Sequence, residues 1–453
     1  MGLDYAVIAA YVLGMVGVGW WGMRRATTRS DYLVAGRRLG WAMYSGTMSA
    51  VVLGGASTIG GVALGYQYGL SGAWLVFTIG LGILALSAFF ARKIVKLEVY
   101  TVAQMLDRRY GGSTSVISGV VMWGYTLMLA VTSTIAYATV FTVLFGLSKV
   151  AGVVLGGTIV VLYSVLGGMW SITLTDIAQF VVKTVGILFV LLPVALVAVG
   201  GFGGLGTKLP AEYFDLGHIG TGRIVTYLVV YVFGLLIGQD IWQRVFTARS
   251  PAVATAGGLT SGLYCLVYAV AGALIGCAAK ALYPNLPHPD EAFATIVTGL
   301  LPTGLRGLVL AAALAAMMST ASGALIACST VARNDIWAAL RRSASGGVRA
   351  ERLSTLALGV LIILIAILVD DVVAALTVAY NLLVGGLLVA ILGGLVSRRG
   401  STAGAVVSMI AGSVAVVVSM LVYGLDANEP VYFGLLASLL GYVSVSLPRK
   451  ETP

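Results

Sequence analysis

The chain has 453 residues, of which 59% are hydrophobic and only 10% are charged. A soluble domain carries roughly 25% charged residues, so this composition excludes an ordinary soluble protein and indicates an integral membrane protein. The formal net charge of +10 does not require a nucleic-acid partner, because cytoplasmic loops of membrane proteins are enriched in Lys and Arg.

The apolar runs are near or above the ~20 residues that a membrane-spanning helix needs. The alternating ten-residue segments of a transmembrane β-barrel are absent from the sequence. We expect an all-α protein with about thirteen spans, at 3–24, 40–66, 72–95, 114–146, 149–167, 170–200, 222–245, 252–283, 304–332, 353–369, 372–396, 402–424 and 430–447. The first span is not expected to be a cleaved signal, because its positive charges follow the apolar run.

Basic residues concentrate in alternate loops. Six such segments, at 24–38, 92–109, 244–249, 333–352, 398–399 and 449–450, hold 21 of the 27 Lys and Arg residues. The positive-inside rule therefore predicts an outside N-terminus and a cytoplasmic C-terminus in a prokaryotic inner (plasma) membrane. The lipid bilayer is the expected environment, and the sequence indicates no oligomeric state. A sensor is disfavoured, because no soluble output domain is evident.

Two spans look interrupted. The second has Gly54, Gly55, Gly60 and Gly61 near its middle, and in the seventh polar residues follow Gly238. The two spans are five apart, and each opens a block of five, at 40–200 and 222–396. Broken helices at matching positions indicate an inverted repeat with a binding site near the membrane midplane. The alternative is glycine used only for close helix packing.

One stripe of the ninth span is small and polar. Ala316, Ser319, Thr320, Gly323 and Ala327 follow helical spacing and share one face. Such a face packs closely against a neighbouring helix, or its hydroxyls join carbonyl oxygens around a small hard cation. The residues alone leave both interpretations open.

Charged residues inside spans are costly and usually functional. Asp176 and Lys183 lie on the sixth span, seven residues apart, which is about two turns on one face. Asp176 is predicted near the cytoplasmic end, whereas Lys183 is close to mid-span. Either a functional role or a structural ion pair is compatible with this pattern.

Several segments resemble the successive signatures of the sodium:solute symporter family. They are SDYLVAGRRLG (30–40), the glycine-broken span ending in ALGYQYG, GGMWSITLTDIAQF (167–180), GQDIWQRVFTAR (238–249) and AALAAMMSTASGALIACSTVARNDIW (312–337). The resemblance implies one transmembrane domain over 1–453 with a leucine-transporter-type core. In that core, 40–200 and 222–396 are the inverted repeats, 3–24 is an additional N-terminal helix and 402–447 holds two C-terminal helices.

The resemblance also implies ion sites. The family's main Na+ site falls here on backbone carbonyls of Ala50, Leu53 and Ala316 and on the hydroxyls of Ser319 and Thr320. A second Na+ site, found in some members, corresponds to Asp176, Ser319 and Ser322. One hydroxyl position of that second site is Gly323 in this sequence, which departs from the pattern.

The implied function is cation-coupled symport, with Na+ as the favoured ion, of a small polar solute such as an amino acid or a carboxylate. Lys183 does not match the residues expected at its position, so a proton-coupled symporter using Asp176 and Lys183 is an alternative. A passive facilitator on the same scaffold is another. An enzyme is not expected, because no nucleophile, paired acid and base, metal cluster or nucleotide loop is evident.

Solute contacts are predicted by position beside the two breaks. The candidates are Gly54, Ser57, Gln239, Asp240 and Tyr380. Further residues that could line the same cavity are Trp123, Tyr125, Tyr137 and Asn381, although lipid-facing or interfacial positions are the more common ones for aromatics in spans. Positions expected for a quaternary-ammonium cage fall on Val52 and Gly238, so choline is not predicted.

Overall fold

The computed structural model describes residues 2–341, 347–369, 372–397, 400–425 and 427–446. Residues 398–399 and 449–450, which were counted among the basic segments, lie outside the described part of the chain. The longer helices are α1 (Gly2–Met23), α3 (Trp41–Val52), α5 (Trp74–Ala85), α8 (Ser113–Phe145), α9 (Lys149–Lys183), α15 (Pro251–Leu282), α17 (Leu305–Val331), α19 (Val348–Leu368), α20 (Val372–Val396), α21 (Thr402–Tyr423) and α22 (Glu429–Ser446). The shorter helices are α2 (Arg29–Val34), α4 (Gly61–Tyr68), α6 (Ala91–Val95), α7 (Val102–Tyr110), α10 (Leu192–Val199), α11 (Gly201–Lys208), α12 (Thr221–Tyr227), α13 (Phe233–Ile237), α14 (Gln239–Val245), α16 (Ala292–Leu300) and α18 (Ala338–Arg341).

The described residues form an all-helical protein with one isolated bridge, between Leu39 and Ala248. Within the described part of the chain, nine helical segments are long and apolar enough to cross a membrane, or ten if α12–α13 and α14, which meet at a 47° bend, count as one span. The predicted all-α membrane class is thus confirmed, whereas the count of thirteen spans stays a prediction. The stretch Lys149–Val199 contains two of the predicted spans, and Gly168 (φ 53°, ψ −134°) interrupts its helix between them.

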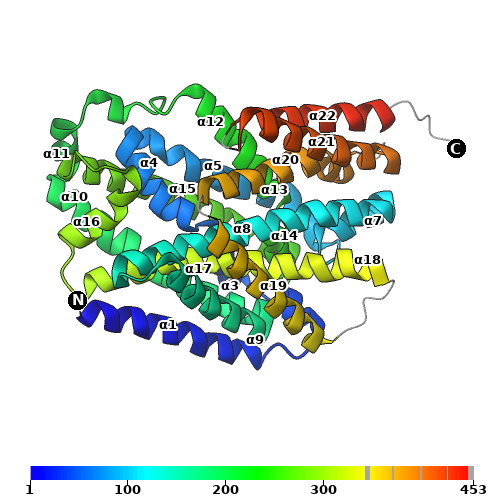
Figure 1. Ribbon diagram of the computed structural model, residues 1–453, viewed down its shortest axis with the longest axis horizontal. Coiled ribbons are helices and arrows are strands. Elements are labelled where there is room, and N and C mark those ends of the chain that lie inside the picture. The colour runs from blue at the N-terminus through cyan, green and yellow to red at the C-terminus, as the bar shows by residue number, and fades with distance from the viewer. Residues whose placement is uncertain (1, 342–346, 370–371, 398–399, 426, 447–453) are drawn as a thin grey trace.

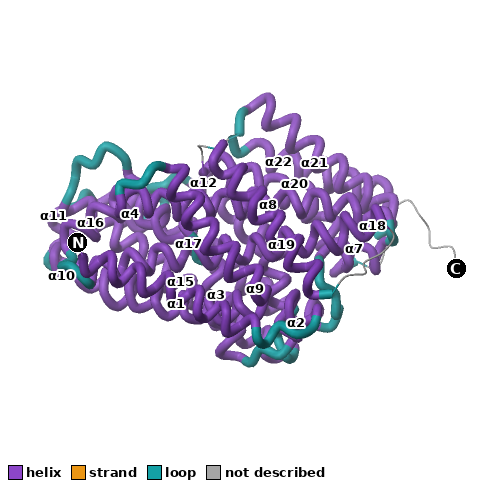
Figure 2. Tube along the Cα trace, turned by 60° about the horizontal axis from the view of Figure 1, so that its bottom comes forward, coloured by secondary structure: helices purple, strands orange, loops and turns teal. Residues whose placement is uncertain are grey.

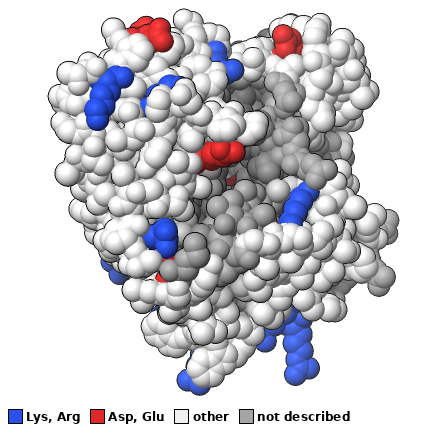
Figure 3. Space-filling view, turned by 60° about the vertical axis from the view of Figure 1, so that its left-hand side comes forward, with Lys and Arg blue, Asp and Glu red and all other residues white. Residues whose placement is uncertain are grey.

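Most long helices run along the long axis of the molecule, and the described ends of the chain lie towards opposite ends of that axis (Figure 1). Helix α1 forms one edge and the antiparallel pair α21–α22 forms the opposite edge, while loops gather mainly at the ends of the helices (Figure 2). Few charged side chains are visible on the face shown in Figure 3, which is hollowed near its centre. The exposed side chains include many large apolar ones, among them Leu13, Phe189 and Leu421, as a lipid-embedded protein requires.

Helix α17 lies at the centre of the packing. Nearly all its residues from Gly307 to Val331 are buried, and it contacts α1, α3, α8, α9 and α19. Its small residues allow this approach, because a helix without large side chains lets neighbouring backbones come close. The predicted stripe of Ala316, Ser319, Thr320, Gly323 and Ala327 therefore sits between helices, and all of its members except Thr320 are buried.

Both predicted interruptions are present. Helix α3 ends at Val52, Leu53 leaves the helical region (φ −105°, ψ 73°), and the chain resumes through a π-helical turn at Ala56–Gly60. The second interruption is at Gly238, which is extended (φ −61°, ψ 132°) between α13 and α14. Each break frees backbone carbonyl groups that a continuous helix would have used.

Candidate ion and solute site

The carbonyl groups at the end of α3 meet the polar stripe of α17. Ser319 Oγ donates to the carbonyls of Ala50 and Ala316, both at 2.9 Å. Thr320 Oγ1 donates to the carbonyl of Val51 at 2.8 Å and lies 3.4 Å from that of Ala316. The predicted main-site residues are therefore brought together around the α3 break, although the two hydroxyls are here hydrogen-bond donors to carbonyls.

Lys183 also reaches this cluster. Its side chain, fully buried at the end of α9, donates from Nζ to the carbonyls of Ser49 and Ala50, each at 3.3 Å, and of Leu53 at 3.2 Å. Two of these three, Ala50 and Leu53, are predicted cation ligands. The ring of Tyr268 on α15 lies 5.8 Å from Nζ, within cation–π distance. The ammonium group thus satisfies the carbonyls that a small cation would need.

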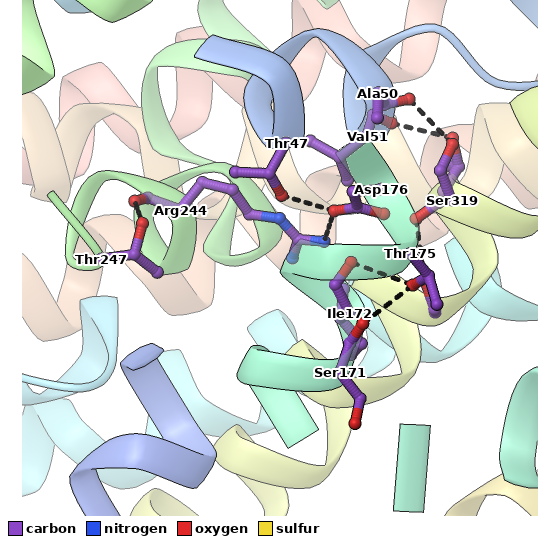
Figure 4. A network of polar contacts seen from close by, with 12 residues as sticks. Thr47, Ala50, Val51, Ser171, Ile172, Thr175, Asp176, Arg244, Thr247 and Ser319 are labelled. Atoms are coloured by element: carbon purple, nitrogen blue, oxygen red, sulfur yellow. Dashed lines mark hydrogen bonds and ion pairs between the residues drawn. The ribbon is translucent and has the colours of Figure 1, made fainter. Parts of the chain in front are cut away.

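Asp176 faces a second buried cation (Figure 4). Its Oδ2 accepts hydrogen bonds from Thr47 on α3 and, at 3.1 Å, from Arg244 NH2 on α14. Asp176 and Arg244 are both completely buried. Arg244 was counted with the cytoplasmic loop arginines, and that placement is wrong, because α14 carries its side chain into the interior.

The hydrogen bonds found for Ser319 and Ser322 among the described residues, the other members of the predicted second ion site, go to backbone carbonyls and not to this carboxylate. Ser322 Oγ donates to the carbonyl of Ser319 on its own helix, at 3.1 Å. The absent side chain of Gly323 leaves room for Arg244, because a Cβ built at Gly323 would lie 2.9 Å from Arg244 NH2. Asp176 Oδ1 and the Nε and NH1 atoms of Arg244 have no hydrogen-bond partner among the described residues.

The predicted solute residues do not form one group. Gln239 hydrogen-bonds to the backbone at the start of α7. Its side-chain amide accepts from the Val102 N–H at 2.8 Å and donates to the Tyr100 carbonyl at 3.0 Å. Ser57 Oγ lies 3.4 Å from the Val52 carbonyl. Gly54 packs directly on Thr320, where an added Cβ would lie 2.6 Å from Oγ1.

Asp240 and Tyr380, in contrast, are joined through Tyr125 on α8. The Tyr125 hydroxyl donates to Asp240 Oδ1 at 3.0 Å, and its ring centroid is 5.6 Å from that of Tyr380 on α20. Tyr125, Tyr137 and Tyr380 are at most 9% exposed, so the expectation that they face lipid is wrong. The sequence offered no signal for this, because aromatic residues occur on both lipid-facing and protein-facing sides of membrane helices.

An all-helical membrane protein with two broken helices that meet at buried polar clusters has the architecture of a secondary transporter. The profile of the sodium:solute symporter family matches residues 32–412. The chain therefore belongs to this family, whose members are transporters and not enzymes.

Similar proteins agree with this assignment. The chain is 28% identical over 401 residues to sodium/glucose cotransporter 4 of Danio rerio, covering 76% of this chain but only 59% of that relative. It is 25% identical to the osmoregulated proline transporter OpuE of Bacillus subtilis, covering 98% and 94% of the two chains. A Na+-coupled sialic acid symporter, solved in a substrate-bound outward-open state, superposes with a TM-score of 0.82 at 19% identity, over 99% and 98% of the chains. That likeness confirms the fold.

Proposed function

We propose that this protein is a cation-coupled secondary symporter that imports a small polar solute by alternating access. Membership of the family and the two broken helices support this function. The blocks 40–200 and 222–396 are the inverted repeats that move against each other. The distribution of loop charges supports an outside N-terminus and a cytoplasmic C-terminus.

The observation that carries the proposal is the meeting of the α3 break with α17. Carbonyl and hydroxyl oxygens are suitable ligands for a hard cation such as Na+. A cation held jointly by Ala50, Leu53, Ala316, Ser319 and Thr320 ties one repeat to the other. It shifts the conformational equilibrium by its difference in affinity for the two states, which is how an ion gradient drives solute uptake.

Family membership supports Na+ as the coupling ion, and the position of Lys183 supports a second candidate, the proton. The ammonium group and Na+ compete for the same carbonyls, so the two ions do not act there together. In the proton version, Lys183 binds H+ when the cluster is open to the outside and releases it when the helices part towards the cytoplasm. The ionisable groups around Nζ are Asp176, paired with Arg244, and Cys265 and Tyr268 of α15.

Uptake into liposomes by the reconstituted full chain tests these versions. The labelled probes are L-proline, myo-inositol, D-glucose and sialic acid, each offered with a Na+ gradient or a pH gradient alone. Proton coupling predicts accumulation under the pH gradient without Na+, and its loss in Lys183→Met but not in the control Lys208→Met, whose side chain is exposed. Na+-driven accumulation retained in Lys183→Met refutes proton coupling. A probe that only equilibrates under both gradients refutes symport and favours a facilitator.

A further inference from the structure

Asp240 is a buried carboxylate that the ion-coupling scheme does not use. It is the second residue of α14, directly after the Gly238 break, and only 4% of its surface is exposed. The ion pairs found among the described residues do not include Asp240. The nearest cation along its own helix, Arg244, donates to Asp176 instead.

One tyrosine contacts this carboxylate, and two further tyrosines from other elements pack in succession behind it. Tyr125 donates its hydroxyl to Asp240 Oδ1 at 3.0 Å. Tyr380 packs edge-on against Tyr125 at 5.6 Å and against Tyr231, from the π-helical turn Leu228–Val232, at 5.3 Å. The faces of tyrosine rings carry negative potential that attracts cations.

Two glycines, Gly234 and Gly238, allow the backbone to pack closely against Tyr380, Tyr125 and Asp240. A Cβ at Gly234 would lie 2.8 Å from the Tyr380 ring, and a Cβ at Gly238 would lie 2.9 Å from Asp240 Oδ1 and 3.2 Å from the Tyr125 hydroxyl. The helix break therefore brings its backbone directly against the carboxylate and the aromatic rings. Side chains at these two positions would fill the space on which the cluster depends.

A buried ionised carboxylate is costly unless a cation or several hydrogen bonds compensate it. Asp240 receives one hydroxyl group and the nearby backbone amides of Asp240 and Ile241. Arg244 acts on it electrostatically, but the ion pair of Arg244 found among the described residues is with Asp176. An ammonium group would supply the missing charge, and the tyrosine rings would stabilise it from the sides. Neutral polyols would gain neither interaction, and a solute carboxylate would be repelled.

We propose that Asp240 with Tyr125, Tyr231 and Tyr380 binds the ammonium group of the transported solute. This inference rests on the proposed transport function and defines its substrate class as organic amines or quaternary ammonium compounds. The rings contact one another in this conformation, so the solute separates them on binding. An amine then donates an N–H to Asp240 Oδ1 in place of the Tyr125 hydroxyl. A quaternary ammonium group has no N–H, so it interacts with the carboxylate by charge and with the rings by cation–π contact.

Matched pairs of probes test the charge requirement. Binding of choline and its neutral carbon isostere 3,3-dimethylbutan-1-ol, and of cyclohexylamine and cyclohexanol, is measured by ligand-induced thermal shift of the full chain in detergent. The expected result is stabilisation by at least one cation and by neither alcohol. Asp240→Asn should weaken binding of that cation roughly 10- to 100-fold, while Tyr125→Phe and the exposed control Glu212→Gln retain charge selectivity.

Two outcomes overturn the inference. One is stabilisation by the alcohols as strong as by the amines, or by none of the four probes. The other is undiminished cation binding in Asp240→Asn, particularly if that variant loses only its pH dependence, which would make Asp240 a proton carrier. An amine that binds through Asp240 but is never accumulated under an ion gradient refutes symport and leaves the ammonium site intact. Accumulation of a neutral solute under an ion gradient supports symport and refutes the ammonium site.

Discussion

The pair formed by Asp176 and Arg244 gives the sharpest energetic prediction. Both side chains are completely buried, and the carboxylate accepts from Arg244 NH2 at 3.1 Å and from Thr47. Asp176→Asn removes the only ion-pair partner that the guanidinium has among the described residues.

The expected magnitude follows from this burial. Removal of one member of a buried pair costs roughly 3–5 kcal/mol, whereas replacement of both members by neutral groups of similar size is often close to neutral. Asp176→Asn and Arg244→Met should therefore each destabilise the protein by about 3–5 kcal/mol. The double variant should lose far less than the sum, which gives a coupling free energy of at least ~3 kcal/mol.

Equilibrium unfolding of the purified protein in mixed micelles, followed by tryptophan fluorescence, measures the three variants. Arg38→Met is the matched control, because Arg38 pairs with Asp31 but is 60% exposed, and exposed pairs contribute about 0–1 kcal/mol. A loss below ~1 kcal/mol in Asp176→Asn, or additive losses in the double variant, would refute the reasoning that the two charges depend on each other.

Two further predictions concern the α3 break and Asp31 of helix α2. Gly54→Ala should destabilise the protein by about 1–3 kcal/mol and abolish gradient-driven uptake, because the new Cβ would lie 2.6 Å from Thr320 Oγ1. The control Gly60→Ala should be tolerated, because a Cβ there meets nothing within 4 Å. Equal behaviour of the two variants in unfolding and uptake assays would contradict this prediction. Burial acts to raise the pKa of Asp31, but hydrogen bonds from Thr28, Thr27 and Trp170 hold this pKa below its usual value. The ionised Asp31 therefore contributes its full stabilisation above about pH 4, and this stabilisation is lost as the pH falls through the lowered pKa. Thermal unfolding between pH 7 and pH 3 should accordingly show a steeper acid loss in wild type than in Asp31→Asn, and parallel curves would exclude this role.

The features that the sequence predicted are those with a local signature. Glycine clusters at 54–61 and at Gly238 interrupt helices because glycine and adjacent polar groups weaken helix continuation. The small face of α17 was visible from its spacing. The burial of Arg244 was not, because a basic residue near the end of a span has the same sequence signature whether it turns to the cytoplasm or to the interior. Tyr125, Tyr137 and Tyr380 were named as residues that could line the solute cavity, but their burial was not predicted for a related reason, since lipid and protein interiors are similarly apolar.

Lys183 and the hydroxyls of α17 share one set of carbonyls, and this bears on how the two candidate coupling ions relate. The Ala50 carbonyl oxygen accepts hydrogen bonds from both Ser319 and Lys183, so both of its lone pairs are engaged by hydrogen-bond donors. A hydroxyl rotates freely and presents either its proton or a lone pair, so Ser319 and Thr320 need no backbone movement to become cation ligands. Withdrawal of Nζ from Ser49, Ala50 and Leu53 would then leave an oxygen cluster suited to Na+. Under the proposed cation-coupled transport, the same oxygens would hold either a bound ion or the tethered ammonium group of Lys183, and uptake by Lys183→Met distinguishes the two.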